Sequence, residues 1–162
     1  MPADVPHRAP RRESGVQPGP PPRRESDVRP GTILQGGRAK AYRPLPAERR
    51  REILLEGLDA YDRGDFFLAH ELLEPAWMGA SDPAERNLYQ GLIKLAAAFV
   101  HDARGNPAGV EKNLRGARDR LAEAVPAGAA AGLDVLAILR EIDAVPAVSR
   151  TEPVPLARLA ID

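Results

Sequence analysis

The fold is decided by residues 61–77, which read YDRGDFFLAHELLEPAW. Gly64 followed by Asp65 predicts the end of one helix and the immediate start of another, because glycine closes a helix in the left-handed conformation and aspartate caps the next helix. At 100° per residue, most apolar residues after Asp65, Leu68 included, share one side of that second helix. We therefore expect a tight corner between two packed helices, with a bend or an early end at Pro75.

The same spacing of small and apolar residues returns further along the chain, where Gly105 takes the place of Gly64. The offset between the two copies suits one helical hairpin, so the sequence predicts two stacked hairpins that share one core. The matched pairs are Gly64 and Gly105, Ala69 and Val110, Leu73 and Leu114, Ala76 and Ala117, Leu54 and Leu95, and Leu58 and Phe99. His70 and Glu74 correspond to Glu111 and Arg115, so the polar cluster is not repeated.

Apolar periodicity predicts five helices, and no segment shows the alternation typical of a strand. Their expected bounds are about 46–63, 65–78, 83–104, 107–125 and 133–143, with an alanine–glycine link before the last. We expect an all-α compact bundle over residues 46–145, followed by an extended tail over 146–162. Ile53, Leu54, Leu58 and Tyr61 should face inward from the first helix.

Residues 1–45 are expected to form a disordered arm, because they hold nine of the 17 prolines and almost no large apolar residues. The arm carries nine Lys/Arg against four Asp/Glu, which is typical of contact with nucleic acid or a membrane, but we favour the simpler explanation that a GC-rich genome encodes many arginines. The sequence RRES occurs twice in the arm, at residues 11–14 and 23–26. The repeat is either a docking or phosphorylation motif or the result of slippage in a low-complexity sequence. We favour slippage, and consider nucleic-acid binding the weakest of the functional interpretations.

The composition indicates in which cellular compartment the protein is expected. The chain has no cysteine, which excludes disulfides and thiolate metal ligands. Residues 1–40 lack the apolar core of a signal peptide, and no apolar run approaches the length of a membrane span. The expected location is the cytoplasm, without a membrane partner.

The sequence His70-Glu71-Leu72-Leu73-Glu74 is the candidate functional motif. It resembles the zinc-protease sequence His-Glu-x-x-His, with a glutamate in place of the second histidine. His70 and Glu74 are neighbours on a helix surface and could bind a divalent metal with ligands from elsewhere. His70, Glu71 and Glu74 are then the candidate catalytic residues. Alternatively, Glu74 accepts a structural hydrogen bond from His70 and no cofactor is involved, which is the interpretation we favour.

Other polar and aromatic residues have simpler explanations. The only other histidine of the helical part, His101, should lie too far from His70 to share an ion within one protomer. Trp77 is expected to anchor a core or an interface. Gln90 should belong to a solvated or interface stripe, and Gly91 should lie opposite His70 and allow two helices to approach closely. Ion pairing on the fourth helix explains its basic residues better than nucleic-acid binding does.

The helical part of the sequence resembles two known families. The spacing of Gly57, Gly64, Ala69 and Leu73 is weakly similar to a tetratricopeptide hairpin. The sequence GDFFLAHELLEPAW at 64–77, with YQGLIKLAAA at 89–98, resembles the bacterial, archaeal and plastid family known as domain of unknown function 309 over about residues 50–123. The resemblance implies a compact helical fold and no particular reaction, with motif positions at His70, Glu71, Glu74, Trp77, Gln90 and Gly91.

The sequence thus leaves three functions possible and does not decide whether the protein is an enzyme. The leading hypothesis is a non-enzymatic interaction or scaffold domain that forms a homodimer and binds an unidentified protein partner. The alternative is a metal-dependent enzyme, such as a hydrolase, that uses His70, Glu71 and Glu74. The weaker alternative is a nucleic-acid-associated protein that acts through the arm.

Overall fold

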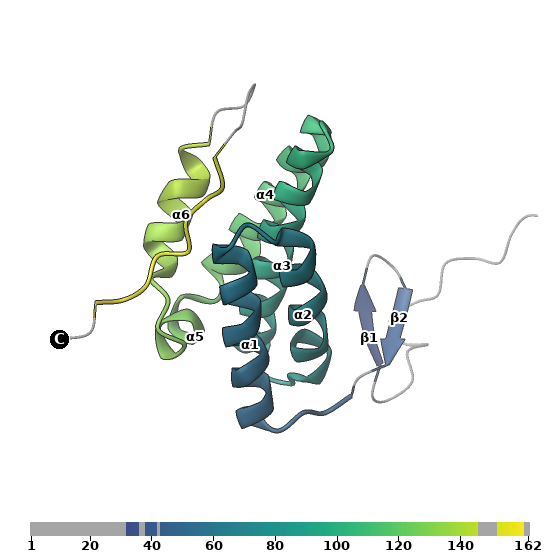
Figure 1. Cartoon of the computed structure of the whole chain (residues 1–162). Coiled ribbons are helices and arrows are strands. Elements are labelled where there is room, and N and C mark those ends of the chain that lie inside the picture. The colour runs from purple at the N-terminus through teal and green to yellow at the C-terminus, as the bar shows by residue number, and fades with distance from the viewer. Residues whose placement is uncertain (1–31, 36–37, 42, 146–151, 161–162) are drawn as a thin grey trace, which may run out of the picture.

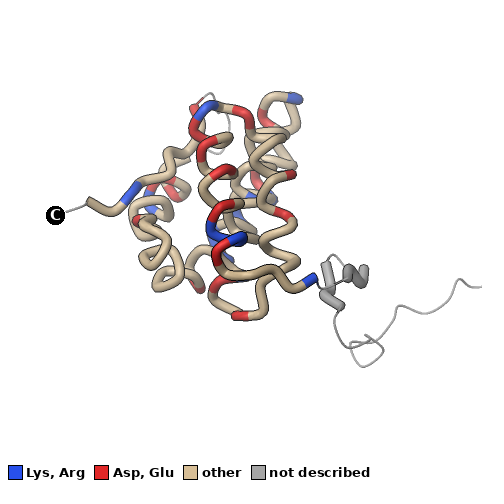
Figure 2. Tube along the Cα trace, turned by 60° about the horizontal axis from the view of Figure 1, so that its bottom comes forward, with Lys and Arg blue, Asp and Glu red and all other residues tan. Residues whose placement is uncertain are grey.

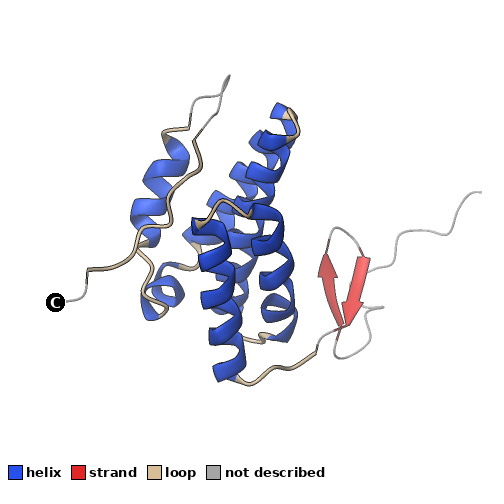
Figure 3. Cartoon of the chain, in the orientation of Figure 1, coloured by secondary structure: helices blue, strands red, loops and turns tan. Residues whose placement is uncertain are grey.

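A computed structural model describes residues 32–35, 38–41, 43–145 and 152–160 of the chain. These residues form two strands and six helices, which Figures 1 and 3 show as a helical bundle with a separate hairpin. The elements are β1 (Thr32–Gln35), β2 (Arg38–Ala41), α1 (Ala47–Asp62), α2 (Phe66–Gly79), α3 (Pro83–Ala103), α4 (Pro107–Ala122), α5 (Val125–Ala130) and α6 (Val135–Asp143). The predicted all-α bundle is confirmed for the helical domain.

The two predicted hairpins are α1–α2 and α3–α4, and their corners are built alike. Gly64 has a φ of 83° and Gly105 a φ of 67°, so both adopt the left-handed conformation that ends a helix. Asp65 N–H donates to Ala60 O in the first corner, and Asn106 N–H donates to His101 O in the second, each at 2.9 Å. The side chains of Asp65 and Asn106 then cap the next helices. The internal repeat is therefore real at the level of individual hydrogen bonds.

The core lies between the two hairpins, and α3 is its central element because it packs against both α2 and α4. Each matched apolar residue of the two repeats is buried. Three aromatic rings close the end of the core beside the first corner, with centroids 5.0 to 6.3 Å apart: Tyr61, Phe66 and Phe99. The predicted inward residues Ile53, Leu54, Leu58 and Tyr61 are all buried.

The N-terminal part departs from the prediction of a strandless arm. β1 and β2 form an antiparallel hairpin in which Thr32 pairs with Ala41 and Gln35 with Arg38. Two glycines stand between the strands in the sequence, and a connection of two glycines between short strands is a signal for a hairpin. Residues 1–31, including both RRES motifs, lie outside the described residues, so the predicted disorder there stays a prediction.

Residues 43–45 contact the bundle just before the predicted start of the domain. Arg43 N–H donates to Met78 O and Leu45 N–H to Gly79 O, both at 3.2 Å. A Cβ atom at Gly79 would lie 2.8 Å from Leu45 Cγ, so this glycine permits the close approach. The segment therefore satisfies backbone groups at the end of α2 that the helix itself leaves unpaired.

Two further expectations need correction. The predicted link before the last helix contains the short helix α5, whose start at Val125-Pro126 suits proline at a first helical turn. α2 continues through Pro75 to Gly79, so the alternative of an early end at this proline is wrong, while the predicted end of the helix near residue 78 is confirmed. None of the helices in the described ranges combines the length and the apolar character that crossing a bilayer demands.

The described part of the tail, residues 152–160, contains no helix and packs back onto the bundle. Val154 and Leu156 are buried, and Tyr61 Oη donates to Val154 O at 2.7 Å. Leu133 and Arg158 form an antiparallel bridge, and Arg158 pairs with Asp62 of α1 at 2.8 Å. Residues 152–160 thus bind to both the start of α6, through backbone hydrogen bonds, and α1, through the ion pair (Figure 1).

Candidate functional site

α2 brings the three predicted site residues together. One ligand atom from each of His70, Glu71 and Glu74 lies within 4.8 Å of the others. Asp65 fixes the start of this helix by accepting a hydrogen bond from Leu68 N–H at 3.2 Å. The cluster is set by local helix geometry, because Glu74 lies three residues after Glu71 and four after His70, and residues at these spacings are neighbours on a helix surface.

His70 has an unusual environment within this cluster. Its Nδ1 atom is buried and has no hydrogen-bond partner among the described residues. The same atom lies 3.4 Å from Glu71 Oε1, which is an electrostatic contact when the imidazole is protonated. The predicted bond from His70 to Glu74 stays a prediction. A buried nitrogen without a partner is costly, so this atom is a candidate for binding a ligand.

The chemistry of these three side chains suits a divalent ion. A neutral imidazole nitrogen and two carboxylates are ligands for zinc, iron or manganese. All three donors come from one helix, so further ligands would be water or a second protein copy. The corresponding residues of the second hairpin cannot do this, because Glu111 and Arg115 form an ion pair at 2.7 Å.

The remaining predicted residues lie apart from this cluster. Trp77 is 2% exposed, and the guanidinium carbon of Arg86 lies 5.8 Å from the centroid of its ring, which is a cation–π arrangement. Gln90 is half-buried on α3. His101 is also half-buried, and its Nδ1 lies 3.1 Å from Asn106 Nδ2 in the second corner.

The prediction that Gly91 lies opposite His70 is wrong. A Cβ atom at this position would lie 2.7 Å from Leu121 Cγ, so the close approach is between α3 and α4. The sequence placed it between α2 and α3, opposite His70. A helix in the middle of a bundle faces two neighbours, and a rotation of one residue, about 100°, decides which neighbour a glycine meets.

A separate pocket of about 290 Å³ lies between α1, α3 and α5. Beside it, Arg50 Nε donates to Glu85 Oε1 at 2.6 Å and Tyr89 Oη donates to the same oxygen at 2.9 Å. Burial raises the pKa of the Tyr89 phenol, and its bond to Glu85 raises it further. None of His70, Glu71 and Glu74 lines this pocket.

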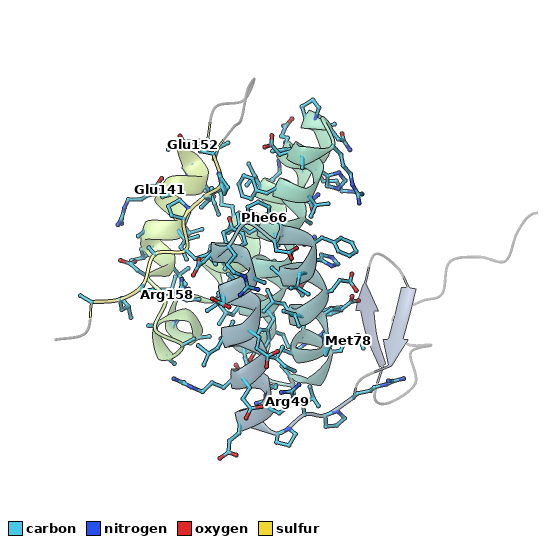
Figure 4. All side chains as sticks on the ribbon, viewed as in Figure 1. Arg49, Phe66, Met78, Glu141, Glu152 and Arg158 are labelled. Atoms are coloured by element: carbon cyan, nitrogen blue, oxygen red, sulfur yellow. The ribbon has the colours of Figure 1, made fainter. Side chains whose placement is uncertain are left out.

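The outward side of α2 is apolar, which the sequence analysis did not anticipate. Four residues of this helix are exposed, namely Phe67, Leu68, Glu71 and Pro75, and we call them the α2 face. Phe67 is 59% exposed and Leu68 36%. The sequence places Leu68 within the apolar arc, whereas in the structure it lies at the edge of that arc. Figure 4 labels Phe66 at the start of α2 and Met78 near its end. His70 and Glu74 are half-buried and, by their spacing on the helix, lie beside Phe67 at one edge of the α2 face.

Comparisons with known proteins agree with the resemblance drawn from the motifs. An uncharacterized protein of Aquifex aeolicus (strain VF5) is 38% identical over 65 residues, which cover 40% of this chain and 20% of that protein. The chain thus spans about a fifth of the length of this relative. No solved structure gave a significant match. The family model described as "Domain of unknown function (DUF309)" matches residues 54–113, from the middle of α1 to the middle of α4. This match over residues 54–113 confirms the resemblance that their motifs predicted.

Proposed function

We propose that the helical bundle is a non-enzymatic interaction domain, and that it forms a homodimer through the α2 face. The observation that carries the proposal is the exposure of Phe67 and Leu68 beside the exposed Pro75. A helix on the surface of a bundle ordinarily turns polar residues outward, so an apolar outer face indicates a contact surface.

The other helices of the bundle support this interpretation by contrast. α1 carries charged residues along its exposed side (Figure 2). α4, the counterpart of α2 in the repeat, exposes mainly charged residues, namely Glu111, Lys112, Arg115, Arg118, Asp119 and Arg120. Both hairpins therefore bury equivalent positions, but α2 exposes two large apolar residues, Phe67 and Leu68, whereas α1 exposes one, Leu55, and α4 exposes none.

A second copy of the chain is the occupant that we propose for this face. A two-fold pair is the commonest soluble assembly, and it places the same patch of both copies in contact. The formal net charge of the chain is zero, so two copies approach without overall repulsion. Phe67 and Leu68 of each copy would cover the same residues of the other, with Glu71 at the rim.

Light scattering of the full chain tests the proposal. We expect a dimer mass at micromolar concentrations, and a monomer mass for Phe67→Glu, because the substitution places a charge in the contact. Leu136→Glu is the matched control, since Leu136 is 54% exposed on α6. A monomeric wild type would contradict the proposal, and so would a dimer that survives Phe67→Glu but not Leu136→Glu.

Metal binding at His70, Glu71 and Glu74 is a second candidate function. It is favoured by the spacing of the ligand atoms and by the unpartnered Nδ1 of His70. A catalytic centre usually occupies a concave site, whereas these residues flank the outer side of α2 and do not line the pocket between α1, α3 and α5. The geometry therefore supports an ion at a surface or subunit contact better than a metal-dependent enzyme.

A further inference from the structure

The side chain of Lys94 lies across the middle of α4. A Cβ atom at Gly116 would lie 2.8 Å from Lys94 Cδ and 3.4 Å from Lys94 Nζ. The ammonium group of α3 is thus held directly over Gly116 of α4. The absence of a side chain at Gly116 makes this path possible.

Two more cations flank this ammonium group. Lys112 and Arg120 lie four residues before and four residues after Gly116, and therefore on the same side of α4, with backbones about 12 Å apart. Arg120 Nη1 donates to Asn87 Oδ1 of α3 at 3.3 Å, which holds the guanidinium group against α3. Lys94, Lys112 and Arg120 therefore share one side of the contact between α3 and α4, and we call them the α3–α4 cation cluster.

The carboxylates near this cluster are engaged elsewhere or lie out of reach. On α4, Arg115 pairs with Glu111 at 2.7 Å and Arg118 with Asp143 at 2.6 Å. No carboxylate of the described residues lies within ion-pair distance of the three cations of the cluster. Burial lowers the pKa of the Lys94 ammonium, and the charges of Arg120 and Lys112 lower it further. Three cations held together in this way repel one another, and a bound anion would relieve that repulsion.

We infer that the α3–α4 cation cluster binds the phosphate or diphosphate group of a small ligand. The guanidinium group of Arg120 and the ammonium groups of Lys94 and Lys112 are all charged hydrogen-bond donors. Together they supply enough N–H groups to bind several oxygens of a phosphate. The cluster has only three cations, and the acidic residues Glu111, Asp119 and Glu123 alternate with the basic residues of α4. A nucleic-acid strand would need a continuous basic track, so the charge pattern favours a single small anion.

Calorimetric titration of the full chain with pyrophosphate at constant ionic strength tests the inference. We expect saturable binding, weakened about ten-fold or more by Lys94→Met and by Arg120→Gln, since each removes a charge-assisted hydrogen bond. Arg115→Gln is the control, because Arg115 is already paired with Glu111, and it should change the affinity less than about two-fold. Inorganic phosphate should bind at the same residues and more weakly.

A third variant separates geometry from charge. Gly116→Ala retains all three cations but adds a methyl group where the Lys94 stem lies, so it should weaken pyrophosphate binding without unfolding the helix. Three results would overturn the inference: no saturable binding of pyrophosphate, an equal loss in Arg115→Gln, or unchanged binding in Lys94→Met and Arg120→Gln. A short single-stranded oligonucleotide that binds these residues more tightly than pyrophosphate would overturn it in favour of nucleic acid.

Discussion

Glu71 of α2 and Lys112 of α4 occupy equivalent positions of the two hairpins and carry opposite charges. The corners that precede them share their left-handed glycines and their hydrogen bonds at matching positions of the repeat. Buried positions of the repeat have kept their apolar character, because a change of volume in a packed core is costly. The outer surfaces have diverged, so that α2 presents an apolar face and α4 a charged one. The two functional proposals rest on this difference.

The left-handed glycines should matter equally in both hairpins. Gly64→Ala and Gly105→Ala should each lower the free energy of unfolding by about 1–2 kcal/mol, because a side chain disfavours a positive φ. Neither site has atoms that a new methyl group would touch, so the backbone alone sets the cost. Urea titration measures it. A loss in only one variant would show that the two corners are not energetically equivalent.

Tyr89 should make stability depend on pH in the alkaline range. Its pKa is raised in the folded state, so its contribution is fully present below the unfolded pKa of about 10 and is lost as the pH rises from there through the folded pKa. The melting temperature of the wild type should therefore fall more steeply above about pH 10 than that of Tyr89→Phe. Parallel curves for the two proteins would mean that the phenol does not titrate differently on folding.

Two N-terminal truncations should differ although they lie only four residues apart. Removal of residues 1–41 should leave the melting temperature within a few degrees. Removal of residues 1–45 should cost about 1–3 kcal/mol, because it deletes the Leu45 contact with Gly79 and two hydrogen bonds at the end of α2. Thermal denaturation followed by circular dichroism distinguishes them. An equal and large loss in both would place a stabilising contact within residues 1–41.

Substitution of His70 separates a structural role from a metal site. If the imidazole is structural, His70→Ala should cost about 1–3 kcal/mol and His70→Gln should recover part of this, since glutamine can still donate a hydrogen bond. If the residue binds metal, both variants should lose it, and a chelator should destabilise only the wild type. We expect no effect of the chelator. A stoichiometric metal in untagged wild type that is lost in His70→Gln would reverse this expectation.

The sequence predicted the helices and their corners because their signals are local. Gly64 and Asp65 encode the end of one helix and the cap of the next within two adjacent residues, and the repeat at Gly105 doubles the evidence. α5 escaped prediction because a stretch of six residues with one proline is too short to show a helical period. The β1–β2 hairpin escaped because each strand has only four residues.

The candidate sites were less predictable, because they depend on how helices are rotated against one another. The sequence placed His70, Glu71 and Glu74 on one helix, and their proximity follows from that. It did not predict that Nδ1 of His70 would be buried beside Glu71, which is a matter of side-chain rotamers. The convergence of Lys94 on Gly116 joins residues of two helices and emerges only from tertiary packing.

The most direct test of the account is cross-linking of single-cysteine variants of the full chain with a short bismaleimide. The natural chain has no cysteine, so each variant reports one position. Glu71→Cys places the thiol on the α2 face, and Lys112→Cys places it at the equivalent position of α4. If two copies meet through the α2 face, Glu71→Cys should yield mostly covalent dimer and Lys112→Cys mostly monomer. Equal yields, or a higher yield for Lys112→Cys, would contradict the account.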